Sequence, residues 1–151
     1  MKLMLRHAVV LGLVLVGTVA LRAGDPLLTM LDPYFRIQTS LSDDKTDGVK
    51  ADAAAIANAA RAMGDSGAPI AKAAVALEGA ADLAAARTAF SQLSDAVITL
   101  SESTKAQPVD GMQAMFCPMV NKQWLQKGDK VSNPYYGKAM LTCGEKKKKS
   151  T

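Results

Sequence analysis

Both cysteines of this 151-residue chain lie near its C-terminal end, and each has a methionine close by. Cys117 and Met119 are two residues apart, whereas Met140 and Cys143 are three apart. Residues two apart share a face in an extended segment, and residues three apart share one on a helical turn. The two pairs can therefore converge on one ion. Thiolate and thioether sulfurs are soft ligands, which suit Cu(I) and Ag(I).

The predicted metal site thus consists entirely of sulfur ligands. Its residues are Cys117, Met119, Met140 and Cys143, with Met112 and Met115 as further thioether candidates. The candidate ions are Cu(I) and Ag(I), and nothing in the sequence indicates a haem or a nucleotide site.

A structural disulfide between Cys117 and Cys143 is the alternative interpretation. The two residues are 26 positions apart, and closing such a loop stabilises a fold by roughly 3–4 kcal/mol in the chain-entropy model. A reduced pair can bind a metal, whereas an oxidised pair cannot. The residues alone leave both interpretations open.

The segment between the two sulfur pairs is rich in aromatic and turn-forming residues. Pro134 fixes its own φ and keeps Asn133 extended, while Gly137 permits a positive φ. We expect this segment to hold the sulfur pairs at a fixed angle and its aromatic rings to cap the core and shield the site. The residues given this structural role are Phe116, Trp124, Asn133, Pro134, Tyr135, Tyr136 and Gly137.

No catalytic residue is nominated, and we expect no enzyme. The only histidine, His7, lies in a predicted leader, so the mature chain has no imidazole to act as a general base. The acidic residues Asp43, Asp44 and Asp47 fit helix caps. Arg87 fits a salt-bridge or packing role.

Residues 1–23 have the pattern of a secretory signal peptide. Lys2 and Arg6 precede an uncharged apolar run over residues 8–21, and the small Ala23 follows. The run is shorter than the roughly 20 residues that span a bilayer. We therefore expect an exported, periplasmic protein with no transmembrane segment in its mature chain.

Removal of this leader nearly neutralises the chain, leaving 15 basic and 14 acidic residues. Four of the basic residues are the consecutive lysines 146–149. We therefore expect residues 146–151 to form a disordered basic tail, and no nucleic-acid partner.

Apolar residues at three- and four-residue spacing predict four amphipathic helices. Their expected ranges are about 26–42, 46–63, 69–79 and 82–103. Asp82 is predicted to cap the fourth helix, in which Leu83, Phe90 and Val97 repeat every seven residues. The predicted fold class is all-α: an up-and-down four-helix bundle over 24–104, with the irregular segment 105–145 packed on it in the same domain.

An ordered string of residues in the C-terminal segment resembles a known family. The string runs Cys117-Pro118-Met119, then Asn133-Pro134-Tyr135-Tyr136-Gly137, then Met140-x-x-Cys143-Gly144. It is similar to a bacterial family of exported helical domains of unknown function, found alone or fused to membrane-fusion adaptors of heavy-metal efflux pumps. The resemblance implies binding or delivery of copper, silver or a related cation, and efflux-pump components as partners.

The expected function is therefore that of an exported soft-metal binding or handling accessory protein linked to metal efflux. The alternative is a non-catalytic helical interaction module whose cysteines form a disulfide. In that case Phe116, Trp124, Tyr135 and Tyr136 would form a docking patch for another protein.

Overall fold

The computed structural model describes residues 26–104 and 111–147, so the predicted signal peptide lies outside the described residues. The helices are α1 Pro26–Ser42, α2 Val49–Arg61, α3 Ala68–Glu78 and α4 Leu83–Thr104. The strands are β1 Met112–Cys117, β2 Lys122–Lys127 and β3 Glu145–Lys146. Two short 3₁₀ helices, η1 Gly64–Ser66 and η2 Gly137–Met140, lie in connections.

The four predicted helices are confirmed. Asp82 caps α4 as expected, since its Oδ1 accepts a hydrogen bond of 2.8 Å from the backbone N–H of Ala85. Pro33 lies inside α1 and does not start a new helix. The chain leaves α1 through Asp44, a non-glycine residue with a φ of 60°.

The predicted all-α class is wrong, because the C-terminal segment forms a three-stranded antiparallel sheet in the order β2-β1-β3. β1 and β2 form a hairpin in which Met112 faces Lys127 and Cys117 faces Lys122. Along β1, Met115 and Cys117 are buried and alternate with less buried neighbours, which is the period of a strand packed on one face. The segment is therefore regular where an irregular one was expected.

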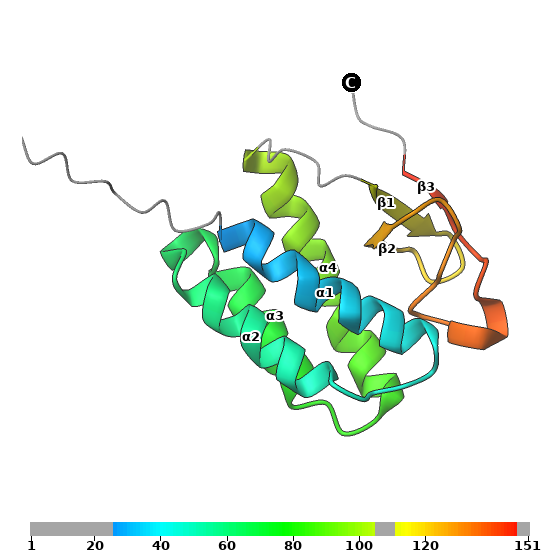
Figure 1. Cartoon of the computed structure of the whole chain (residues 1–151), viewed down its shortest axis with the longest axis horizontal. Helices are drawn as coiled ribbons and strands as arrows, with labels where there is room; N and C mark the ends of the chain where they lie inside the picture. The colour runs from blue at the N-terminus through cyan, green and yellow to red at the C-terminus, as the bar shows by residue number, and fades with distance from the viewer. Residues whose placement is uncertain (1–25, 105–110, 148–151) are drawn as a thin grey trace, which may run out of the picture.

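The sheet packs on one side of the helices, with α1 and α4 between it and the pair α2 and α3 (Figure 1). Tyr34 of α1 joins the two layers. Its hydroxyl is hydrogen-bonded to Ser94 Oγ of α4 at 2.6 Å and accepts a bond of 3.0 Å from the backbone N–H of Leu125 in β2. A helix side chain thereby pairs a polar group at the outer edge of the sheet.

Aromatic rings continue the core from the helices into the sheet. The ring centroids of Tyr34 and Phe90 are 5.1 Å apart, and those of Trp124 and Tyr135 are 5.9 Å apart. All four residues are buried. Trp124 and Tyr135 therefore belong to the same hydrophobic core as the helices.

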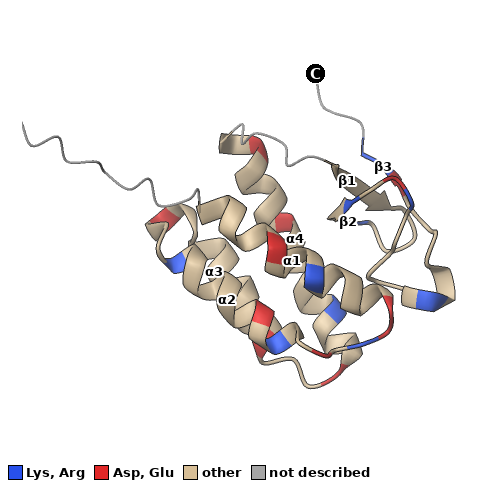
Figure 2. Ribbon diagram, viewed as in Figure 1, with Lys and Arg blue, Asp and Glu red and all other residues tan. Residues whose placement is uncertain are grey.

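Charged groups are dispersed over the described part of the chain. Figure 2 shows Lys and Arg interspersed with Asp and Glu over the helices, with no continuous basic face in that view. Lys146 lies in β3, and the backbone N–H of Lys147 donates to the Ala114 carbonyl at 2.8 Å. None of the helices described has the length and apolar character needed to cross a membrane.

Candidate thiol site

The two cysteines meet at the end of β1. Their Sγ atoms are 3.4 Å apart, and both are free thiols. Cys117 is buried and Cys143 is half-buried. The pairing of β3 with β1, in which Phe116 faces Glu145, brings the chain around Cys143 back to Cys117. The separation is well beyond the ~2.05 Å of a disulfide bond.

Cys117 lies where the β1–β2 hairpin turns. Pro118 to Asn121 make the turn, with Asn121 in the left-handed region at a φ of 52°. This geometry aims the backbone N–H groups of Met119 and Val120 at the Cys117 sulfur. Such convergent backbone donors stabilise a negative charge.

The surroundings give the two thiols different acidities. Burial raises the pKa of Cys117, but hydrogen bonds from Val120, Cys143, Asn133 and Met119 more than offset this effect. The pKa of Cys117 is therefore below the ordinary value for a cysteine. The pKa of Cys143 is raised, because its proton is held in the hydrogen bond to Cys117 and because of burial. The pair thus favours a Cys117 thiolate that accepts a bond from the Cys143 thiol.

Asn133 organises the loop that carries Cys143. Its side chain is fully buried, and its Nδ2 donates to the carbonyl oxygen of Cys143 at 2.6 Å. Its Oδ1 accepts from the backbone N–H groups of Tyr135, at 2.8 Å, and Tyr136, at 3.3 Å. The same amide bonds Cys117. Asn133 therefore fixes both limbs of the thiol pair.

Arg87 of α4 anchors the turn after Asn133 to the helices. Its Nε donates to the carbonyl oxygen of Pro134 at 2.9 Å, and its Nη2 donates to that of Leu41 at 3.0 Å. The same Nη2 forms an ion pair of 2.6 Å with Asp44. The predicted salt-bridge role of Arg87 is confirmed. Asp44 also accepts from the backbone N–H of Lys138 at 3.2 Å, so it holds the start of η2.

Gln126, which the sequence did not single out as a site residue, orders the segment between β2 and Asn133. Its side chain is buried in β2. Its Oε1 accepts from the Trp124 indole and from the backbone N–H of Ser132, each at 3.1 Å, and its Nε2 donates to the backbone carbonyl oxygen of Lys130 at 2.8 Å. Nothing in the local sequence marks Gln126 as buried, because it follows Leu125 and precedes the exposed Lys127, and three of its four partners lie beyond the end of β2.

The four candidate methionines lie in different environments. Met119 is 63% exposed on the hairpin turn, and Met140 is 36% exposed at the end of η2. Met115 is 1% exposed and belongs to the core, while Met112 is half-buried at the start of β1. The fold brings the two thiols together and leaves the side chains of Met119 and Met140 exposed.

Within residues 26–104 and 111–147, no group of three or more His, Cys, Asp or Glu side chains is placed to hold a metal ion. In that part of the chain, the thiol pair is therefore not supplemented by a third ligand of these types.

The fold and site define a helical domain with a small thiol-bearing sheet packed on its side. The chain belongs to the family described as "Protein of unknown function (DUF3347)", whose model matches residues 30–108. That match covers nearly all of the four helices and ends before β1. Neither the curated proteins nor the solved structures contain a significant match to this chain.

Proposed function

We propose that this protein is an exported accessory protein that binds a soft monovalent cation, Cu(I) or Ag(I), as its cargo. The observation that carries the proposal is the approach of two free thiols to 3.4 Å. Convergent hydrogen-bond donors around Cys117 favour the thiolate, which is the form that binds metal.

The distance between the thiols suits a shared ion. Two sulfurs bound at about 2.3 Å to one ion, in a tetrahedral or wider arrangement, lie about 3.8 Å or more apart. The observed 3.4 Å needs only a small opening to reach that value. Cys143 is half-buried and Cys117 is buried. We infer that Cys143 meets the ion first, loses its proton to solvent, and that the Cys117 thiolate then retains the ion.

Met119 and Met140 are the thioethers that can supply further ligands, because each lies at the surface within three residues of a cysteine. We propose that either side chain turns toward the thiols to add a soft ligand. Met115 is part of the core and is left out of the proposed set.

The proposed export rests on the charge and hydropathy pattern of residues 1–23, and the proposed link to efflux-pump components rests on the resemblance of the Cys-Pro-Met segment. No nucleic-acid partner and no catalytic reaction are part of the proposal.

The test is an anaerobic titration of Cu(I) against a chelator of known affinity, using protein reduced beforehand. We expect tight one-to-one binding. Cys117→Ser and Cys143→Ser should each weaken it by roughly 100-fold or more, since a hydroxyl is a poor ligand for a soft ion. Met119→Ala with Met140→Ala should weaken it less, and Met63→Leu is the matched control. Unchanged affinity in the double cysteine variant would refute the metal site.

A structural disulfide is the second candidate, favoured by the same proximity. Closing the pair requires an approach of about 1.4 Å from the observed separation. A thiol count on protein purified without reductant separates the two: no free thiols, and no Cu(I) uptake after reduction, would favour the disulfide. We do not include the predicted aromatic docking patch in this second candidate, because two of its four residues, Trp124 and Tyr135, are buried.

A further inference from the structure

A groove runs between one face of α4 and the β1–β2 hairpin, with a volume of about 640 Å³. That volume is within the range of pockets that enclose small organic ligands. Leu83, Val120 and the ring of Tyr135 supply its apolar surface, and the side chains of Arg87 and Lys122 line it as well.

The groove is lined by two cations and by no acidic residue. Arg87 is held rigidly, because its Nε and Nη2 bond the Pro134 and Leu41 carbonyl oxygens and the Asp44 carboxylate. Those bonds leave its Nη1 for a ligand. Lys122 is held loosely, since its nearest carboxylate, Asp95, lies 4.0 Å away. One oxygen of Asp95 already accepts from Gln123 at 3.1 Å.

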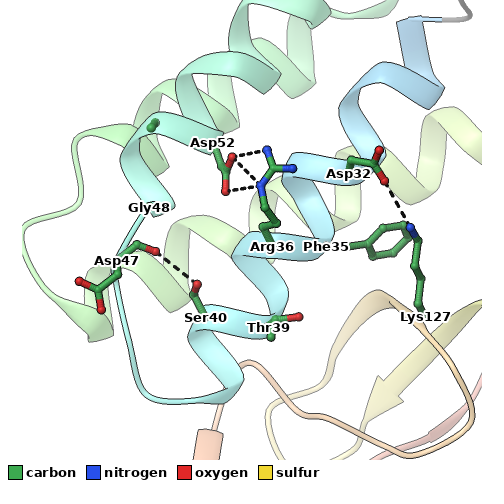
Figure 3. A pocket seen from close by; sticks show the side chains of 10 residues that line it. Asp32, Phe35, Arg36, Thr39, Ser40, Asp47, Gly48, Asp52 and Lys127 are labelled. Carbon is green, nitrogen blue, oxygen red and sulfur yellow. Dashed lines mark hydrogen bonds and ion pairs between the residues drawn. The ribbon is translucent and has the colours of Figure 1, made fainter.

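A second groove, between α1 and the start of α2, has a volume of about 690 Å³ and the opposite character (Figure 3). Three aspartates line it, and both of its cations are paired. Arg36 donates to the Asp52 carboxylate through Nε and Nη2, and the Nζ of Lys127 lies 3.3 Å from Oδ1 of Asp32. The groove between α1 and α2 therefore has no unpaired cation to bind an anion among its lining residues. It serves as an internal control for the α4 groove.

We propose that the α4 groove binds a small amphipathic carboxylate. The carboxylate would pair with Lys122 and the free edge of Arg87, because charge-assisted bonds of this kind are stronger than neutral ones. The apolar body would lie against Leu83, Val120 and Tyr135. This site is separate from the thiol pair, and its proposal does not depend on metal binding.

The test uses the full chain and two matched probes, 4-phenylbutyrate and 4-phenylbutanol, followed by amide chemical shifts in NMR titrations. We expect the carboxylate to saturate with shifts confined to α4 residues 83–92, to hairpin residues 120–122 and to the residues around Tyr135. The alcohol, which lacks the charge, should bind roughly tenfold more weakly.

Three variants locate the site. Lys122→Gln should weaken 4-phenylbutyrate binding roughly five- to tenfold through loss of one ion pair. Ala84→Trp, at an exposed position of α4 that lines the groove, should fill the space and abolish binding. Lys127→Gln, in the α1–α2 groove, should leave the affinity unchanged.

The proposal is overturned if the carboxylate does not saturate, if the alcohol binds equally well, or if the shifts lie elsewhere. It is also overturned if Ala84→Trp, with a parent-like circular dichroism spectrum, keeps the parent affinity. Cu(I) titration of the same variants keeps the two proposals distinct, because Lys122→Gln should leave metal binding intact.

Discussion

At the residue scale, one buried amide determines the shape of the thiol site. Asn133 bonds the Cys143 carbonyl oxygen and the N–H groups of Tyr135 and Tyr136, and it also contacts Cys117. Its backbone partners in the loop are buried or partly buried, and no other hydrogen bond to them is made by a side chain of the site. The cost of an unpaired buried group exceeds the net gain from a typical hydrogen bond. The amide is therefore a structural requirement of the site.

Asn133→Ala should lower the free energy of unfolding by about 2–4 kcal/mol, because it removes a fully buried amide and its hydrogen bonds to buried and partly buried backbone groups. Denaturant unfolding followed by Trp124 fluorescence measures this loss. Asn58→Ala is the matched control: Asn58 is exposed and bonds only Arg61 on the surface of α2, so a change within about 0.5 kcal/mol is expected. Similar losses in the two variants would contradict the role assigned to Asn133.

At the element scale, Gly137 lets η2 pack against the end of α1. Its φ is +54°, in the left-handed region. A Cβ atom at this position would overlap the Asp44 carboxylate and the Arg87 guanidinium. These two groups form the ion pair that anchors the turn to the helices. Glycine is therefore required here both by backbone conformation and by close contact.

Gly137→Ala should be compared with Gly128→Ala, because both glycines have positive φ. The space around Gly128 is open, so alanine there should cost only the backbone strain, about 1 kcal/mol. Alanine at 137 must also displace the ion pair, and we expect a loss of about 3 kcal/mol or more. Denaturant unfolding measures both. If the two variants lose the same free energy of unfolding, the close contact with Asp44 and Arg87 does not affect stability.

At the scale of the whole molecule, two tyrosines join the helical layer to the sheet. Tyr34 bonds Ser94 and the Leu125 amide. The Tyr135 ring lies 6.1 Å from that of Phe90 in α4, centroid to centroid, and its hydroxyl donates to the Gln123 carbonyl oxygen of β2. Burial raises the pKa of both tyrosines well above the ordinary value, because a buried phenolate loses its hydration. The junction between the layers is thus sensitive to alkali.

A tyrosine whose pKa is higher in the folded state makes its full contribution to stability at any pH below its unfolded-state pKa. That contribution is lost as the pH rises from the unfolded-state pKa toward the folded-state pKa. Stability should therefore fall above about pH 10, by about 1.4 kcal/mol per pH unit for each buried tyrosine. Tyr34→Phe should lower stability at neutral pH by about 1–2 kcal/mol, since the Leu125 N–H loses its partner. Above pH 10 the free energy of unfolding of this variant should fall less steeply with pH than that of the parent, by about 1.4 kcal/mol per pH unit. Denaturant unfolding from pH 8 to 11.5 measures both effects. If the free energy of unfolding of Tyr34→Phe falls with pH as steeply as that of the parent, Tyr34 does not contribute to the alkaline loss of stability.

The sequence by itself determined the helices and pointed to the thiol pair. Helical hydrogen bonds and side-chain stripes connect residues three or four apart, so local spacing sufficed to predict α1 and the Asp82 cap of α4. The concentration of sulfur near the C-terminal end pointed to Cys117 and Cys143, whose thiols do meet.

Only the tertiary structure decided the sheet, the thioether positions and the groove. The strands contain few residues, several of them Lys or Gln, so their alternation is weak. β3 pairs with β1 across a long intervening segment. This pairing brings Cys143 back to Cys117, whereas the packing of the hairpin on α4 brings Lys122 and Arg87 to the lining of one groove. Contacts between distant segments depend on the packing of the whole chain, which local spacing does not encode.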